Sequence, residues 1–163
     1  MRREIGIGIL AAAALTATAA GQTYNVTNTL DDGSAGSLRW AINQANGWTG
    51  AATINIQSGL GTIGITGPMP LLNNAAGITV IGNNNTISGN DLYRPFFVQS
   101  GVLSLQDLTI TNARAQGGTG GGGGLGAGAA VFVYSGGLSV NNVLFTNNSA
   151  NGGNGGTVPV YRP

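Results

Sequence analysis

The sequence lacks cysteine, histidine and lysine altogether, although it is 163 residues long. The absence of cysteine excludes both a disulfide framework and a thiolate metal site, so an exported chain of this composition has to be held together by packing alone. The absence of histidine and lysine removes two side chains that commonly accept protons in catalysis. These absences narrow the side-chain chemistry that is available to the chain.

Charged residues of either sign are also scarce, at 7% of the sequence. The basic residues are all arginines: Arg2, Arg3, Arg39, Arg94, Arg114 and Arg162. The acidic residues are Glu4, Asp31, Asp32, Asp91 and Asp107. After residue 19 four charges of each sign remain, so no net charge draws the chain toward nucleic acid or an anionic membrane surface. We expect the protein to bind its partners through polar and apolar contacts.

What the sequence contains in quantity is glycine, with 30 residues, together with one clear internal repeat. The stretch from Ser100 to Gly118 recurs from Ser135 to Gly153 with the same length and no gap. Residues recur in step at an offset of 35 positions: Ser100/Ser135, Leu103/Leu138, Ser104/Ser139, Thr111/Thr146, Asn112/Asn147 and Ala115/Ala150. Similarity at a fixed period is the signature of stacked repeats. The two copies are therefore predicted to lie one on the other.

Each copy of the repeat alternates like a β-strand. Apolar residues lie two positions apart, with mostly polar or small residues between them: Leu103 and Leu105, then Leu108 and Ile110. Gln106-Asp107 in one copy and Asn141-Asn142 in the other separate two short strands that meet at a corner. Such a unit buries its apolar face only when it stacks on a similar unit. An antiparallel meander, the alternative, would favour two-residue turns of the Asn-Gly type, which these corners lack.

The first 19 residues have the organisation of a secretory signal peptide. Two arginines precede an apolar run from Ile5 to Leu15, and Ala17-Thr18-Ala19 supplies the small residues of a cleavage site. The run is shorter than the roughly 20 residues that a helix needs to cross a bilayer. The sequence predicts Sec-type export with cleavage after Ala19 or close by. A buried helix or a short membrane anchor is the alternative.

Residues 20–50 are predicted to form an N-terminal cap of one strand and one short helix. Thr23–Thr27 alternates like a strand, and Ser37 is a suitable N-cap residue. One face of the helix would be apolar, made by Leu38, Ala41, Ile42 and Ala45. A helix here would cover the open end of a stack of strands. Trp40 and Trp48 are predicted to help the helix cover this end of the stack. The alternative is that they form an aromatic platform that binds sugars.

The cap residues resemble a known family. Tyr24–Gly33, Gly36–Ile42 and Ala45–Asn46 are similar to the N-terminal cap of bacterial secreted right-handed parallel β-helix proteins, especially autotransporter passenger domains. The likeness covers nearly all of residues 22–156, although Trp40 stands where such proteins often carry an acidic residue. It implies a monomer displayed at the cell surface and linked to the outer membrane only through a C-terminal β-barrel beyond this sequence.

Residues 51–156 are predicted to be the turns of the β-helix. Short strands are expected at Thr53–Ile56, Thr62–Ile65, Gly77–Ile81, Asn85–Ser88 and Phe96–Val98, followed by the two repeat copies. Pro68 and Pro70 belong in a loop or corner, because proline cannot donate to a strand ladder. No stretch has the periodicity of a crossover helix, so parallel strands have to coil. The predicted fold class is all-β, a right-handed parallel β-helix (β-solenoid) with a short N-terminal capping helix.

Three features accompany these turns. Residues 117–128, GGTGGGGGLGAG, are expected to be a flexible insert, since a phosphate-binding glycine loop would need a following Gly-Lys-Ser/Thr. Asn112 and Asn147, with residues 83–85, are expected to stack at equivalent corners as an asparagine ladder, or else only to form turns. Residues 157–163 are interpreted as a tail or the truncation end of a longer passenger, in which case the last turn would expose a bare apolar edge.

The acidic residues favour structural roles. Asp31 and Asp32 lie in a cap turn, and Asp107 lies at a corner where the second copy has asparagine. Asp91 and Arg94, next to Tyr93, are predicted to form a loop ion pair, with a functional site as the alternative. Enzymes of β-helix fold that cleave polysaccharides need two carboxylates flanking a bond, or an acidic calcium cluster with a proton acceptor. We therefore assign no catalytic, cofactor-binding or metal-binding residue.

These features together predict a non-catalytic protein that is secreted or displayed on the bacterial surface. It would be a β-helix segment of an autotransporter-like passenger, acting as an adhesin or surface scaffold. Its partner would be a host or cell-surface glycan or protein. The alternatives are a polysaccharide lyase or glycoside hydrolase of the β-helix type, and a purely structural spacer.

Overall fold

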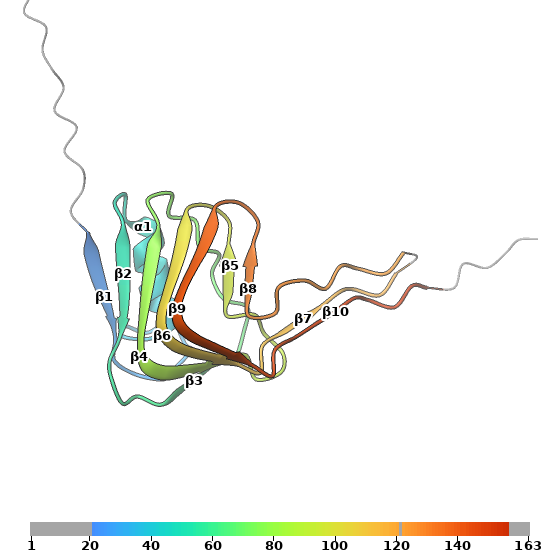
Figure 1. Ribbon diagram of the computed structural model, residues 1–163, viewed down its shortest axis with the longest axis horizontal. Coiled ribbons are helices and arrows are strands. Elements are labelled where there is room, and N and C mark those ends of the chain that lie inside the picture. Colours follow the sequence, from blue (N-terminus) through green and yellow to red (C-terminus); the bar gives the residue numbers. More distant parts are fainter. Residues whose placement is uncertain (1–20, 121, 157–163) are drawn as a thin grey trace, which may run out of the picture.

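A computed structural model describes residues 21–120 and 122–156 (Figure 1). Apart from one short helix, the regular elements of this part of the chain are β-strands. The main sheet has the order β1 (Gln22–Val26), β2 (Ala52–Ile56), β4 (Ile78–Ser88), β6 (Val102–Thr111) and β9 (Gly137–Thr146), with β3 (Thr62–Gly64) paired to β4. The all-β character of the prediction is confirmed. The predicted signal peptide and the tail lie outside the described residues.

Two smaller sheets accompany the main one. In the first, β5 (Phe96–Val98) pairs with β8 (Val131–Val133), and Leu72 joins through a bridge to Val98. In the second, β7 (Arg114–Gln116) pairs with β10 (Ser149–Asn151). The pairings between the named strands are parallel in all three sheets. β8 follows the glycine-rich insert and was not predicted from the sequence.

The two repeat copies lie side by side and in register. Leu103 of β6 is opposite Leu138 of β9, and Ala115 of β7 is opposite Ala150 of β10. The offset of 35 residues therefore holds along the whole copy. Because these strands run parallel, the antiparallel meander is excluded.

The long strands bend where the sequence predicts corners. The backbone is left-handed at Asp107 (φ 49°) and at Asn142 (φ 52°), a conformation that aspartate and asparagine adopt more readily than most residues. At the same bend β4 contains extra residues, and its register with β6 therefore shifts between Ile81 and Asn85. In β4, β6 and β9 the two predicted short strands are thus the two halves of one bent strand.

Side-chain hydrogen bonds connect neighbouring strands near this bend. The Asn55 amide donates to Asn25 at 3.1 Å, and Asn83 donates to Asn55 at 3.0 Å. The predicted ladder is therefore wrong for Asn112 and Asn147, and Asn83 instead bonds an asparagine of β2, which in turn bonds one of β1. Asn112 and Asn147 do not share the corner of Asn83, because each follows a β-strand at the next bend along the chain, where φ is 50° and 54°.

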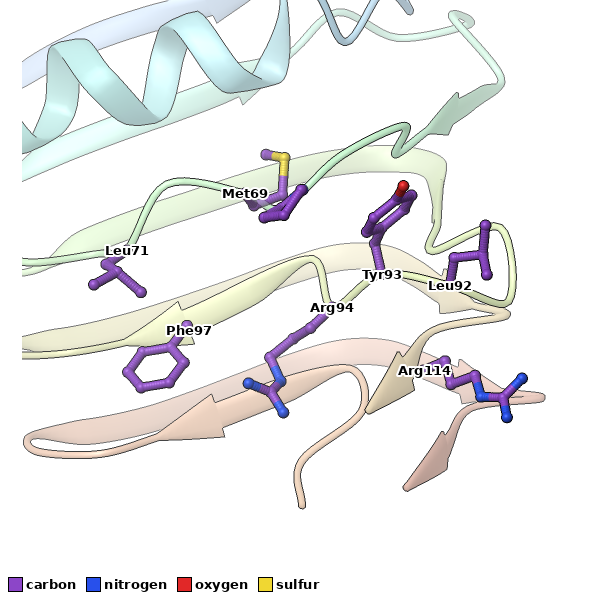
Figure 2. Close-up of a pocket in the computed structure, with 8 residues that line it drawn as sticks. Met69, Leu71, Leu92, Tyr93, Arg94, Phe97 and Arg114 are labelled. Atoms are coloured by element: carbon purple, nitrogen blue, oxygen red, sulfur yellow. The ribbon is translucent and has the colours of Figure 1, made fainter. Parts of the chain in front are cut away.

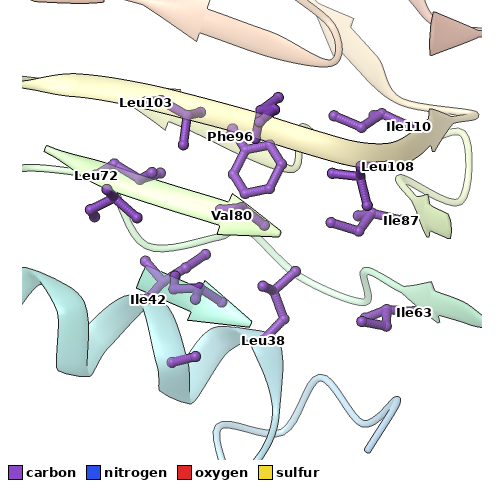
Figure 3. Packing of buried hydrophobic residues seen from close by; sticks show 14 of the residues in the cluster. Leu38, Ile42, Ile63, Leu72, Val80, Ile87, Phe96, Leu103, Leu108 and Ile110 are labelled. Atoms are coloured by element: carbon purple, nitrogen blue, oxygen red, sulfur yellow. The ribbon is translucent and has the colours of Figure 1, made fainter. Parts of the chain in front are cut away.

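Helix α1 (Leu38–Gly47) packs against β1 and β2 at one end of the stack. The hydroxyl of Ser37 accepts a hydrogen bond from the Trp40 amide at 3.2 Å, which confirms the predicted N-cap. The predicted apolar face is completely buried: Leu38, Ala41, Ile42 and Ala45. It faces a core that continues from one strand to the next (Figure 3). Trp40 and Trp48 are partly buried against this core, as predicted for the cover.

The opposite end of the stack is uncovered in the described residues. Leu103 is 1% exposed, whereas Leu138, its neighbour in the last long strand, is 42% exposed. Val140, Leu144 and Phe145 of β9 are also exposed. The predicted bare apolar edge is confirmed, since a strand shields its neighbour only on the side that it covers.

The glycine-rich insert leaves the strands, as predicted, and runs beside residues 151–156 (Figure 1). Gly117 donates to Asn151 at 2.8 Å, and Gly153 donates to Gly124 at 2.8 Å. A Cβ on Gly117 would collide with the carbonyl oxygen of Gly124. The sequence predicted a flexible insert and did not predict these backbone partners. Backbone hydrogen bonds, rather than buried side chains, connect them, and glycine permits the close approach.

Candidate functional site

A groove of about 270 Å³ is the first candidate for a binding site. It lies between the loop that follows β3 and the loop that precedes β5 (Figure 2). Its lining is mainly apolar and consists of Pro68, Met69, Leu71, Leu92, Tyr93, Arg94, Phe97 and Arg114. Leu71 and Leu92 are exposed at its rim. No carboxylate lines it.

Arg94 in this groove is committed to the chain itself. Its Nε donates to the Gly128 carbonyl and its Nη2 to the Ala127 carbonyl, both at 2.6 Å. Its guanidinium also lies over the rings of Phe97 and Phe132, 5.7 and 5.1 Å from their centroids. Burial lowers the pKa of Arg94 from its usual value. Arg94 therefore fastens the end of the glycine-rich insert to β5 and β8.

The predicted ion pair between Asp91 and Arg94 is wrong. Asp91 is exposed on a left-handed bend (φ 58°), and its backbone amide donates to Asn112 at 2.7 Å. The ion pair found in the described part of the chain joins Arg39 to Asp31 instead. The guanidinium of Arg94 points toward Phe97 and away from Arg114 (Figure 2). The two positively charged groups therefore do not face the same point in the groove.

Replacing Arg94 by lysine is expected to lower the free energy of unfolding by about 1–3 kcal/mol, because lysine cannot reproduce the two-pronged donation or the ring contacts. Amide hydrogen exchange at residues 122–128 is expected to speed up. Denaturant unfolding measures the loss of stability, and hydrogen exchange followed by mass spectrometry measures the faster exchange. Arg114→Lys is the matched control, since Arg114 is exposed and its side chain bonds only Gln116 in the described residues. Equal effects of the two changes would contradict this role.

Asp31 is the most deeply buried carboxylate in the described residues, with its side chain 1% exposed. It accepts from Arg39 Nη2 at 2.8 Å and Nε at 3.0 Å, and from the Thr66 amide at 2.7 Å. Arg39 in turn donates to the carbonyls of Gly67 and Pro68. The network ties the cap to the loop after β3. The sequence placed Asp31 in a turn and did not reveal these partners.

Asp32 makes the local turn contact that the sequence predicts, whereas Asp107 lies at the predicted corner but bonds a residue of the second repeat copy. Asp32 accepts from the hydroxyl of Ser34 at 2.6 Å and from its amide at 2.9 Å, and these bonds lower the pKa of Asp32. Asp107 accepts from the Asn142 amide at 2.7 Å across the corner. In residues 21–120 and 122–156 no three acidic side chains gather where they could hold a metal ion.

The outer face of the main sheet holds a second candidate, a row of hydroxyl groups that we call the hydroxyl ladder. It consists of one residue from each of five neighbouring strands, paired in register: Thr23, Thr53, Thr79, Ser104 and Ser139. Their side chains make no hydrogen bond within the described part of the chain. An amide-rich row lies beside it: Asn25, Asn55, Ile81, Gln106 and Asn141.

Compared with models of protein families, with curated proteins and with solved structures, the chain matches none of them. The likeness to the β-helix cap therefore remains a resemblance carried by residues such as Gly36–Ile42. Within the described residues, no helix is both long enough and apolar enough to span a membrane.

The hydroxyl ladder was not predicted from the sequence, although the sequence contains part of the pattern. The repeat aligns Ser104 with Ser139, and the alternation places both on the outer face. The other members are separated along the chain by different distances, because the loops between strands differ in length. Until the pairing of the strands is known, Thr23, Thr53 and Thr79 cannot be distinguished from threonines that are common in any β-strand.

Proposed function

We propose that the chain is an exported segment of a right-handed parallel β-helix that acts as a non-catalytic adhesin or surface scaffold of the autotransporter passenger type. The observation that supports this most is the continuous parallel register from β1 through β2, β4 and β6 to β9. Strands that stack in this way with a shared core form a stiff rod. Such a rod presents side chains to a partner at a regular spacing.

The placement of the carboxylates supports a non-catalytic role. Asp31, Asp32 and Asp107 accept hydrogen bonds that hold the cap or the corners of the fold. Catalytic carboxylates would instead flank a groove that admits substrate. The protein acts as a monomer, and its partner is a host or cell-surface glycan or protein.

Expression of the whole chain in a Gram-negative bacterium tests this proposal. The protein is expected in the periplasmic or surface fraction, with a mass that corresponds to loss of about 19 residues. The purified protein is expected to release no unsaturated or reducing ends from pectin, alginate or other acidic polysaccharides. Retention of unprocessed protein in the cytoplasm would contradict export. Turnover abolished by Asp91→Asn or Asp107→Asn would contradict the non-catalytic role.

A further inference from the structure

We propose that the hydroxyl ladder is the ligand-binding face of this rod and that its ligand is the surface of an ordered, uncharged polysaccharide. This inference rests on the proposed adhesin function and names its ligand class. It arises from three properties of the face: its spacing, its lack of charge and its rigid support.

The spacing of the ladder is set by the backbone. Neighbouring strands of a sheet lie about 4.8 Å apart, so the five hydroxyl groups repeat at about this distance along the rod. The amide-rich row lies two residues further along each strand, about 6.6 Å away. A ligand that meets all five hydroxyl groups in equivalent positions has to be periodic itself. The irregular surface of a globular protein lacks such a repeat, whereas a polysaccharide provides one.

The chemistry of the two rows matches that of sugar hydroxyls. A serine or threonine hydroxyl both donates and accepts, and a side-chain amide also offers one group of each kind. Because the five ladder hydroxyls have no hydrogen-bond partner in the described residues, ligand binding would not have to break protein contacts. Individually weak contacts that repeat along one polymer reinforce one another.

The charge of the face decides which polysaccharides it fits. The five strands that carry the ladder contain a single charged residue, Asp107, which lies at the corner and accepts from Asn142. The face therefore offers no cation to a uronate or sulfate group. Both arginines that line the groove lie outside these strands. Neutral chains are favoured over anionic ones.

The core fixes the ladder in place. The residues that follow Thr53, Thr79 and Ser104 in their strands point inward and are fully buried: Ile54, Val80 and Leu105. A face whose backbone is held by such packing loses little conformational freedom on binding. A regular, preorganised row of this kind suits the surface of a solid better than a small molecule, which would contact one or two of the hydroxyl groups only.

The test is retention of the purified whole chain on microcrystalline cellulose, a neutral polysaccharide with an ordered surface. The variant Thr53→Val/Thr79→Val/Ser104→Ala removes three hydroxyls while keeping β-branched residues at two of the positions. Binding is expected to weaken roughly ten- to hundredfold, because three hydrogen-bonding groups are lost together. The matched control is Thr86→Val/Thr109→Val/Thr111→Val, which alters partly exposed threonines beyond the bend. The control is expected to change binding less than about twofold.

Thermal unfolding of both variants, which should match the parent, separates lost binding from lost folding. Absence of retention on cellulose, equal retention of the ladder variant, or stronger retention on alginate would each overturn the proposal. Inhibition of ice growth without retention on cellulose would assign the ladder to ordered water and overturn it as well. These outcomes leave export and the lack of turnover untouched, so they are distinguishable from failure of the proposed function.

Discussion

Replacing Leu103 by alanine is expected to lower the free energy of unfolding by about 2–5 kcal/mol. Leu103 is 1% exposed because β4 and β9 flank its strand and the core closes over its side chain. Truncation would remove apolar contacts and leave a cavity that the neighbouring strands cannot collapse to fill. Urea unfolding followed by circular dichroism measures the change.

Leu138→Ala is the matched control for this prediction. It removes the same atoms at the same position of the repeat, one strand further along, where the side chain is 42% exposed. Its cost is expected to be less than half that of Leu103→Ala, because a half-exposed side chain loses less transfer free energy and leaves no closed cavity. Equal costs would mean that the two copies are covered equally, contrary to the stacking described above.

Replacing Asp31 by asparagine is expected to destabilise the protein by about 3–5 kcal/mol, the range for removing one partner of a buried ion pair. The change keeps the shape of the side chain but leaves the Arg39 guanidinium without its counter-charge. It also weakens the acceptor for the Thr66 amide. Because this network joins the cap to the loop after β3, faster hydrogen exchange is expected in α1 as well.

Asp32→Asn is the control for the Asp31 prediction. Asp32 is exposed, and its hydrogen bonds reach only Ser34, two residues away. Asparagine keeps an oxygen acceptor for this turn, so a much smaller loss is expected. If Asp32→Asn proved as costly as Asp31→Asn, the stabilising role of the buried pair would be contradicted.

The sequence predicted those parts of the fold that depend on local pattern. Two-residue alternation located β6 and β9, and the repeat placed them in register at an offset of 35 residues. Ser37 and the helical spacing of four apolar residues located α1 and its buried face. Asp107 and Asn142 marked the bend because their side chains tolerate a left-handed backbone.

The parts that the sequence did not predict depend on partners far apart in the chain. Asp31 meets Thr66 across 35 positions, and Arg94 meets Gly128 across 34. Neither contact produces a periodic pattern in the sequence. The contacts of Gly117 with Gly124 were missed for another reason, because a run of glycines looks featureless until the backbone brings two of its segments together. The hydroxyl ladder likewise becomes visible only when five strands are aligned.

The most direct test of parallel, in-register stacking uses the absence of cysteine from the chain. Thr79 and Ser104 are paired across β4 and β6, so cysteines at these positions would have Cα atoms about 4.8 Å apart, within the range that a disulfide spans. Cysteines at Thr79 and Gln106 would be about 8 Å apart, beyond that range. Under mild oxidation the first pair is expected to close within one molecule and the second to stay reduced, as measured by peptide mapping. Closure of the offset pair in preference to the aligned pair would contradict the stacked register on which this account depends.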